Sequence, residues 1–238
     1  MRGAEIVALA GHAEAVRAAM ARATLYEYAA ASAGARPLTG RAIAWATTLP
    51  DGTRVVVRHS RHGGRLASLT GDVFLRPTRA PGELARALAL AAAGVLTPEV
   101  VAYAVYPAFG PLARADVVTR FVEGRDFPDA WREAADEPHR DLLLAATAVL
   151  LDSLRRAGAE HPDLNLKNIL LTSGSEPVAQ VLDVDRVRFG VPGGHVIAER
   201  NLARLNRSAR KWRSRQGLAI SERHLGNLAR LEQLTAAK

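Results

Sequence analysis

The spacing of hydrophobic positions changes along the chain, from short alternating runs in the first half to longer helical repeats in the second. Residues 41–49 alternate loosely, residues 54–58 are β-branched, and Asp51-Gly52 between them predicts a two-residue hairpin turn. A helix is predicted from about Pro81 to Ala93, where Gly94 ends it. Two further strands are expected at 98–106 and 115–122, and the Ala-rich residues 1–35 are expected to be helical.

After Glu123-Gly124 the pattern becomes mostly helical, with a long apolar helix over about 140–157. Short apolar runs at 169–171 and 178–182 flank a Ser-Gly-Ser turn and predict one small hairpin. The chain therefore reads as an α+β protein with a β-rich lobe at 1–122 and an α-helical lobe at 123–238.

Composition excludes several classes of protein. Hydrophobic residues make up 48% of the 238 positions and charged residues 24%, which is an ordinary globular balance and excludes wholesale disorder. Cysteine is absent, which excludes disulfides, thiolate zinc sites and a cysteine nucleophile. The longest apolar run, 142–151, is too short to span a bilayer, and the N-terminal residues show no signal pattern. We expect a cytoplasmic protein.

The positive charge is concentrated near the C-terminus. The chain carries a net charge of +8, whereas residues 186–238 alone hold 12 Lys and Arg against three acids. Five of these cations fall on one helical face: Arg200, Arg204, Arg207, Lys211 and Arg215. This face is either a solvated surface or one that adsorbs to an anionic membrane. Because no aromatic platform or known nucleic-acid module accompanies it, we expect no nucleic-acid partner.

One segment carries the pattern of a phosphoryl-transfer site. Residues 161–171 read H-P-D-L-N-L-K-N-I-L-L, and Asp183 follows Asn168 by 15 positions. Such chemistry needs one carboxylate beside the attacking hydroxyl, and an amide and a second carboxylate to hold Mg²⁺ against nucleotide phosphates. Asp163, Asn168 and Asp183 fit these needs. We expect His161 to bond the loop backbone rather than carry a proton, and Lys167 to point into solvent.

Beyond this segment, the chain resembles the protein-kinase-like lipopolysaccharide kinase family, in particular members that phosphorylate 3-deoxy-D-manno-octulosonic acid (Kdo). The resemblance covers about 38–213 and includes H-x-D-L-N at 161–165, where protein kinases read H-R-D-L-K. It also includes V-V-V-R-H at 55–59 followed by Gly63-Gly64, D-V-D-R at 183–186, and N-L-A-R-L-N-R-S at 201–208.

The resemblance implies a two-lobed protein-kinase-like fold that binds ATP and Mg²⁺. Asp163 is then the catalytic base, Asn168 and Asp183 hold Mg²⁺ and the nucleotide, and Gly40 belongs to a reduced Gly loop with Ala42 in place of a second glycine. Arg58 takes the place of the kinase lysine and pairs with Glu83. Without the resemblance, Arg58 and Glu83 read as a strand-end charge and an acid favoured by a helix N-terminus.

The implied activity is phosphorylation of the 4-hydroxyl of Kdo on a lipid A precursor. The implied place of action is the cytoplasmic face of the inner membrane, with peripheral association to an anionic surface. Two alternatives stay open. One is a kinase for another core sugar or a small aminoglycoside-like acceptor, and the other is a catalytically silent scaffold with a kinase fold at the membrane.

Overall fold

The computed structural model describes residues 3–38, 43–61 and 71–236. Its contacts divide the chain into two compact units, one of residues 1–85 and 98–121 and the other of residues 86–97 and 122–238. Helix α4 (Arg79–Ala92) begins in the first unit and ends in the second. Because 86–97 belongs with the C-terminal residues, the second unit is not one continuous stretch of sequence.

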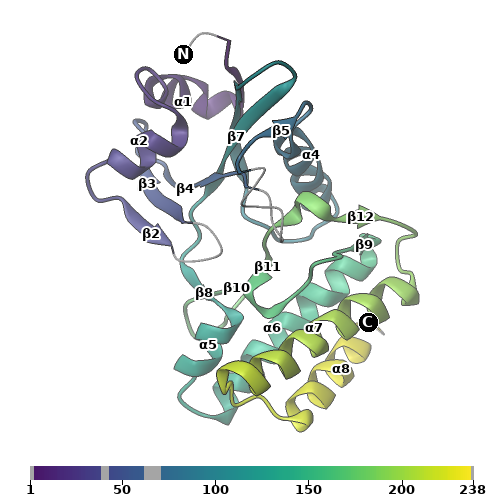
Figure 1. The fold of residues 1–238 in the computed structure, drawn as a ribbon. Coiled ribbons are helices and arrows are strands. Elements are labelled where there is room, and N and C mark those ends of the chain that lie inside the picture. The colour runs from purple at the N-terminus through teal and green to yellow at the C-terminus, as the bar shows by residue number, and fades with distance from the viewer. Residues whose placement is uncertain (1–2, 39–42, 62–70, 237–238) are drawn as a thin grey trace. The chain divides into compact units, whose positions relative to one another are not determined.

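The first unit is built on an antiparallel sheet with strand order β1-β6-β7-β4-β3-β2, and β5 also pairs with β7 (Figure 1). Strands β4, β6 and β7 are the longest of this sheet, and they lie between shorter strands. Its strands are β1 (Glu5–Ala8), β2 (Arg36–Leu38), β3 (Ala44–Thr48), β4 (Arg54–His59), β5 (Phe74–Leu75), β6 (Val100–Pro107) and β7 (Leu112–Arg120).

A hairpin is present at Asp51-Gly52 as predicted, but its turn is longer than two residues, because the last strand pair is Thr48 opposite Arg54. It joins β3 to β4, and Gly52 adopts φ 85°, a left-handed conformation that glycine accepts without strain. Along β4, Val55 and Val57 are fully buried, as the two-residue period of a strand requires. They pack in one core with residues of helices α1 (Ala13–Ala19) and α2 (Leu25–Ala31).

The first 35 residues are only partly helical, so the sequence prediction is wrong at their start. Residues 5–8 form strand β1, which pairs with β6 from Glu5 opposite Val105 to Ala8 opposite Ala102. Short Ala-rich helices gain little stability by themselves, and the edge of a buried strand offers backbone partners. Tertiary pairing therefore decides the structure of this segment. Beyond the 3₁₀ turn Ala10–His12, α1 and α2 are helical as expected.

The second unit is mainly helical, and α6, α7 and α8 lie side by side in it (Figure 1). Asp136 caps α6 by accepting a hydrogen bond from the backbone N–H of His139 at 2.9 Å, so the helix begins three residues before the predicted position. Its helices are α5 (Phe127–Glu133), α6 (Glu137–Arg156), α7 (His195–Gln216) and α8 (Glu222–Ala236), with 3₁₀ turns at Leu166–Asn168 and Val184–Arg186.

The predicted small hairpin is present as β10 (Ile169–Thr172) and β11 (Ala179–Val181). The sequence missed a third strand, β8 (Gly124–Asp126), which pairs with β10. It also missed the pair of β9 (Ala159–Glu160) with β12 (Arg188–Phe189). These strands are two or three residues long, too short for any hydrophobic period to reveal. In the described part of the chain, no helix is long and apolar enough to cross a membrane.

Gly124 stands where β8 approaches β10 too closely for any side chain. A Cβ at this position would overlap the backbone carbonyl oxygen of Leu171. We therefore expect Gly124→Ala to lower the free energy of unfolding by about 1–3 kcal/mol, as overpacking does. Thermal or urea unfolding measures the change.

Gly226 supplies the matched control, since it lies in the interior of α8 with open space around its Cα. Gly226→Ala should raise stability by about 0.5–1 kcal/mol through helix propensity. If the two substitutions shift the unfolding midpoint in the same direction, the close approach at Gly124 is not the cause.

Candidate active site

The loop from His161 to Asn168 is anchored by its first side chain. His161 is fully buried, and its ring Nε2 lies 3.0 Å from the backbone carbonyl oxygen of Leu182. Because a carbonyl oxygen only accepts, Nε2 carries the proton and donates it in this bond. His161 therefore ties the loop to the end of β11, one residue before Asp183. The expectation that this histidine bonds the backbone is confirmed.

Helix α7 fixes the same loop from the other side. Asn201, which is fully buried, accepts a hydrogen bond from the backbone N–H of His161 at 3.0 Å and donates one to the backbone carbonyl of Ala159 at 2.9 Å. Two helical turns further on and on the same face, Ser208 Oγ accepts from the backbone N–H of Leu166 at 3.1 Å. Both residues belong to the 201–208 motif, whose sequence alone gives them no role. The signal available in the sequence was a polar residue, Asn201 or Ser208, at a helical position that otherwise faces inward, since a buried polar group needs a hydrogen-bond partner.

Asp163 presents its carboxylate at the surface of the second unit, where its side chain is 51% exposed. Arg186 Nη1 donates to Asp163 Oδ2 at 2.5 Å, and the backbone carbonyl of Asp163 accepts from the side-chain amides of Asn165 at 2.8 Å and Asn168 at 3.0 Å. The backbone of Asp163 is thus held from two sides, while its carboxylate stays accessible beside one arginine. The pairing with Arg186 was not predicted.

Asn168 and Asp183 come from adjacent segments of the same unit. The backbone N–H of Leu182 donates to the carbonyl of Asn168 at 2.9 Å, which brings the residue before Asp183 against the end of the loop. Asp183 has φ 54° and ψ 52°, the one left-handed residue other than glycine in the described chain. A conformation of this kind costs about 1–3 kcal/mol and clusters at functional sites. The structure thus brings Asp163, Asn168 and Asp183 together in the second unit.

The donor chemistry of this cluster fits Mg²⁺. Asn168 uses its side-chain nitrogen to hold the backbone of Asp163, which leaves the amide oxygen as its ligand atom, and Asp183 offers a carboxylate. Both are hard oxygen donors, and Mg²⁺ normally binds one or two protein groups while keeping waters and phosphate oxygens. Two protein ligands are therefore enough for a magnesium ion shared with a nucleotide.

Lys167 is exposed, as expected from the sequence, but its ammonium group also has partners in the fold. Its Nζ lies 2.6 Å from Asp126 Oδ2 and 5.6 Å from the ring centroid of Trp212. The side chain joins the loop to the end of β8 and to α7. A surface cation with two partners far away in sequence cannot be identified from local pattern.

In the first unit, Arg58 and Glu83 form the ion pair that the resemblance implied, with Arg58 Nη2 donating to Glu83 Oε1. Arg58 is the second-last residue of β4, and Glu83 lies in the first turns of α4. The Glu83 side chain is buried while that of Arg58 is one-third exposed. Gly40 and Ala42 of the expected Gly loop, like Gly63 and Gly64, lie outside the described residues.

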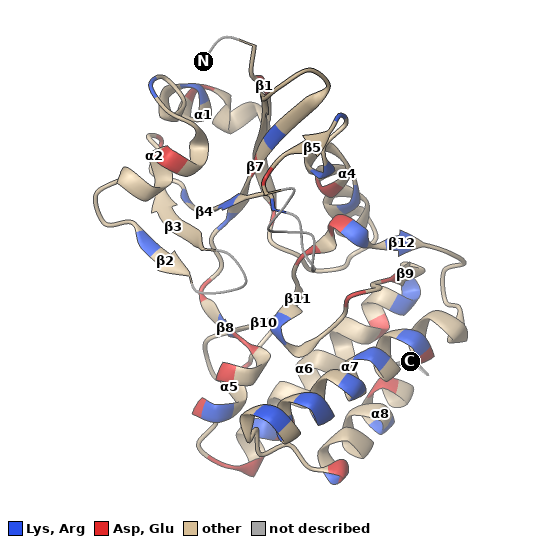
Figure 2. Ribbon diagram, in the orientation of Figure 1, with Lys and Arg blue, Asp and Glu red and all other residues tan. Residues whose placement is uncertain are grey.

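Lys and Arg positions recur along α7 (Figure 2), and they differ in their partners. Arg200 and Arg204 both bind Glu160, and Arg210 and Arg213 both bind Glu222, at distances of 2.6–3.0 Å. Within the described chain, Arg207, Lys211 and Arg215 are exposed and form no ion pair. The basic face predicted from sequence is therefore real, but Arg200 and Arg204 are already engaged.

Comparison with known proteins gives a consistent result. The model of the lipopolysaccharide kinase (Kdo/WaaP) family matches residues 30–225. A protein named 3-deoxy-D-manno-octulosonic acid kinase in Xylella fastidiosa (strain M12) is 30% identical over 202 residues, covering 82% of this chain and 77% of its own. Proteins of the same name in Stenotrophomonas maltophilia (strain K279a) and Xanthomonas oryzae pv. oryzae (strain PXO99A) are 31% and 33% identical, over 82% and 75% of this chain and 78% and 71% of their own.

A solved structure described as WaaP in complex with acyl carrier protein matches with a TM-score of 0.58. It covers 96% of this chain and 88% of its own, at 21% identity. The shared fold is protein-kinase-like, which confirms the fold class expected from the sequence.

Asn201 gives a direct test of how the loop is held. Replacing it with Ala leaves the N–H of His161 and the carbonyl of Ala159 buried without partners, so Asn201→Ala should lower the free energy of unfolding by about 2–4 kcal/mol. Urea unfolding measures it. On the same helix, exposed Ser214 bonds only the carbonyl of Lys211. Ser214→Ala should change stability by less than about 0.5 kcal/mol, and a comparable loss in both variants would contradict the assignment.

Proposed function

The chain belongs to the lipopolysaccharide kinase (Kdo/WaaP) family, and we propose that it transfers the γ-phosphoryl group of ATP to the 4-hydroxyl of Kdo on a lipid A precursor. Its coarser activity, phosphoryl transfer in lipopolysaccharide core synthesis, follows from that membership. The acceptor is proposed from the names of the relatives, whereas the phosphoryl-transfer chemistry rests above all on one observation. The second unit gathers an accessible carboxylate, an amide and a second carboxylate in the arrangement that phosphoryl transfer needs.

In the proposed mechanism Asp163 accepts a hydrogen bond from the attacking sugar hydroxyl and takes its proton as the bond to phosphorus forms. The amides of Asn165 and Asn168 hold the backbone of Asp163, so its carboxylate does not need to reorganise during the reaction. Arg186 lies against the same carboxylate and adds positive charge where phosphate oxygens approach. Mg²⁺, held by Asn168 and Asp183, would neutralise charge on the phosphates.

Arg58 is proposed to bind the nucleotide phosphates from the first unit. No lysine precedes Lys167, so the cation proposed for this position of β4 is an arginine. The buried carboxylate of Glu83 fixes the Arg58 guanidinium, which reduces the entropy lost when a phosphate binds. Gly40, outside the described residues, is proposed to cover the same phosphates.

Asp163→Asn tests the reaction and its base together. The amide keeps the shape of the side chain but cannot accept the hydroxyl proton, so turnover should fall by about 10²–10⁴-fold while MgATP binding is retained. Mass spectrometry of a Kdo-bearing lipid A precursor, incubated with protein and MgATP, should show a gain of one phosphate. Fragmentation assigns the phosphate to the 4-hydroxyl.

The matched control is Asp141→Asn, an exposed acid on α6, which should leave turnover unchanged. Phosphate gain with Asp163→Asn at the wild-type rate would reject Asp163 as the base. Absence of phosphate gain with bound MgATP would favour another acceptor, and absence of both would favour the scaffold alternative.

We also propose that the protein associates peripherally with an anionic membrane through Arg207 and Lys211 of α7. These two exposed cations form no ion pair within the described chain, so they are available to lipid headgroups. Their neighbours Arg210 and Arg213 are instead held by Glu222. Adsorption of this kind would bring the site to the membrane surface, where a lipid-linked acceptor resides.

The double variant Arg207→Ala/Lys211→Ala should weaken binding to vesicles of anionic lipid by about 2 kcal/mol, roughly 30-fold, since each surface cation contributes about 1 kcal/mol. Vesicle co-sedimentation measures the change. Arg210→Ala/Arg213→Ala removes the same charge from the same helix and should weaken binding much less. Equal losses would indicate a net-charge effect, and binding insensitive to salt would contradict electrostatic adsorption.

A further inference from the structure

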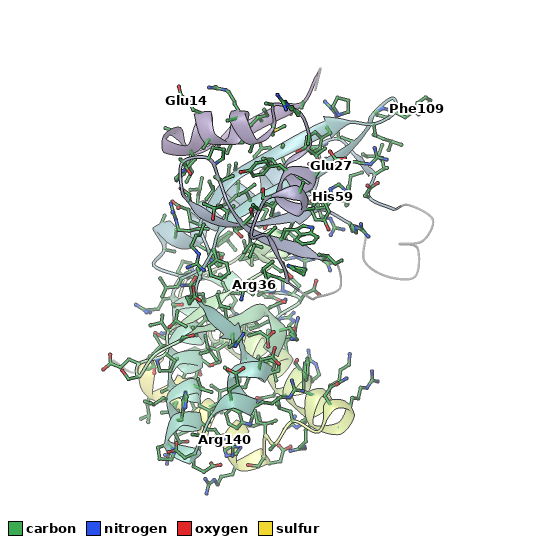
Figure 3. The ribbon with its side chains drawn as sticks, turned by 90° about the vertical axis from the view of Figure 1, so that its left-hand side faces the viewer. Glu14, Glu27, Arg36, His59, Phe109 and Arg140 are labelled. Carbon is green, nitrogen blue, oxygen red and sulfur yellow. The ribbon has the colours of Figure 1, made fainter. Side chains whose placement is uncertain are left out.

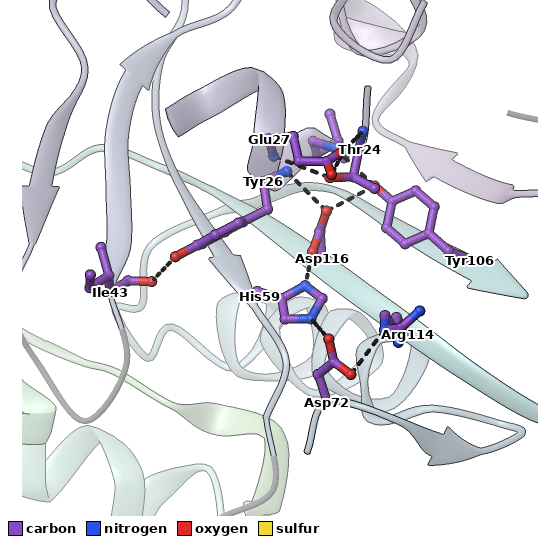
Figure 4. Close-up of polar contacts among 10 residues, drawn as sticks. Thr24, Tyr26, Glu27, Ile43, His59, Asp72, Tyr106, Arg114 and Asp116 are labelled. Carbon is purple, nitrogen blue, oxygen red and sulfur yellow. Dashed lines mark hydrogen bonds and ion pairs between the residues drawn. The ribbon is translucent and has the colours of Figure 1, made fainter. Parts of the chain in front are cut away.

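A cluster of polar side chains surrounds the last residue of β4, outside the groups used so far (Figure 4). His59 lies between two carboxylates, with Nδ1 2.6 Å from Asp116 Oδ1 and Nε2 2.9 Å from Asp72 Oδ2. Carboxylates in ion pairs only accept hydrogen bonds, so both ring nitrogens donate and the ring is an imidazolium. A histidine of this kind carries a positive charge in the cluster rather than acting as a neutral packing residue.

The inner carboxylate requires that charge. Asp116 is fully buried on β7, and its Oδ2 accepts from the hydroxyl of Tyr106 and the backbone N–H of Tyr26, each at 2.9 Å. These two donors are neutral, and in the described structure His59 is the cation in contact with this carboxylate. Removing the positive charge would leave a buried anion uncompensated, which is strongly destabilising.

The outer carboxylate links the ring to a third segment. Asp72 accepts from His59 on one oxygen and from Arg114 Nε on the other, at 2.9 Å each. The ring therefore joins β4, β7 and the residues just before β5. Helix α2 also faces the ring of His59. The ring of Tyr26 lies 5.5 Å from it, and the charges of Glu27 and His59 interact. Figure 3 labels Glu27 and His59.

These surroundings stabilise the charged ring. The hydrogen bond that His59 donates to Asp116, followed by the charge of Asp116 and by the hydrogen bond and charge of Asp72, raises the pKa of His59 above its ordinary value of 6.5, against the opposing effect of burial. With a raised pKa in the folded state, the stabilisation is complete below about pH 6.5 and is lost as the pH rises through the raised value. The charge that holds the cluster is therefore lost on the alkaline side of the ordinary histidine pKa.

We propose that His59 is a positioning residue for nucleotide binding, which holds the end of β4 so that Arg58 meets the phosphates in a fixed orientation. Successive residues of a strand point to opposite faces. Arg58 is held by Glu83 on one side of β4, and His59 is held by Asp116 and Asp72 on the other. The end of β4 is thus held by ion pairs on both faces, and loss of the His59 ion pairs would disturb the orientation of Arg58. This inference rests on the proposed role of Arg58 in binding ATP.

The test measures the affinity of the full chain for MgATP by calorimetry from pH 6 to pH 9. Wild-type affinity should fall on the alkaline side as His59 loses its proton. His59→Gln should bind about tenfold more weakly at pH 6.5 and lack that fall, because it removes a charged hydrogen-bonding group. Ionisation of the nucleotide itself affects all variants alike and cancels in the comparison.

Asp72→Asn is the sharper variant, because Asp72 is partly exposed and its loss leaves Asp116 compensated. Removing one negative charge beside the ring should move the transition in MgATP affinity to lower pH, a shift that a merely structural residue would not produce. His12→Gln is the matched control, since His12 pairs with Asp51 at 2.7 Å near the start of the same strand. It should leave both affinity and transition unchanged.

The outcomes separate the two proposals. An alkaline transition that moves with Asp72→Asn and disappears with His59→Gln supports the positioning role. Wild-type binding without an alkaline transition, or a transition that Asp72→Asn fails to move, overturns that role and leaves the proposed kinase activity standing. Failure of the wild type to bind MgATP at any pH overturns the proposed function and this inference with it.

Discussion

Two hydrogen bonds made by one buried amide hold the loop from His161 to Asn168, and the arrangement of the proposed site depends on them. Asn201 satisfies the backbone on both sides of Glu160, so the chain leaves β9 in one direction only. His161 then reaches the end of β11, which sets the distance between the loop and Asp183. Because buried backbone groups are costly when unpaired, these bonds stabilise the observed loop conformation over those that would break them. Helix α7 is thus the support on which the second unit builds its chemistry.

Local sequence was enough to predict an element wherever one signal dominates. Asp51-Gly52 predicted a hairpin because few dipeptides favour a tight turn between strands, and the long helical pattern of apolar residues at 140–157 predicted α6. Residues 5–8 were misread because their strand exists only beside β6. Strand β8 escaped notice for a similar reason, since its partner β10 lies more than 40 positions further along the chain. Pairing between distant segments leaves no mark in local periodicity.

The same distinction applies to the candidate site. Asp163, Asn168 and Asp183 were found because their spacing within one stretch carries chemical meaning. Their supporting residues were not, since Asn201 and Arg186 act through contacts across 40 and 23 positions. The left-handed backbone of Asp183 was invisible as well, because aspartate gives no reliable local sign of that conformation. Motif spacing predicts reactive groups, whereas the groups that hold them appear only in three dimensions.

The left-handed conformation of Asp183 places stability and chemistry in opposition at one position. Glycine would adopt φ 54° without strain but would remove the proposed metal ligand. Most other residues would leave the backbone strained and would also remove the carboxylate. Selection for stability alone would therefore favour glycine here, a replacement that removes the proposed metal ligand. A relative that carries glycine at this position is expected to be inactive and to unfold at a higher temperature. A gain in thermal stability at this position would then accompany the loss of catalysis.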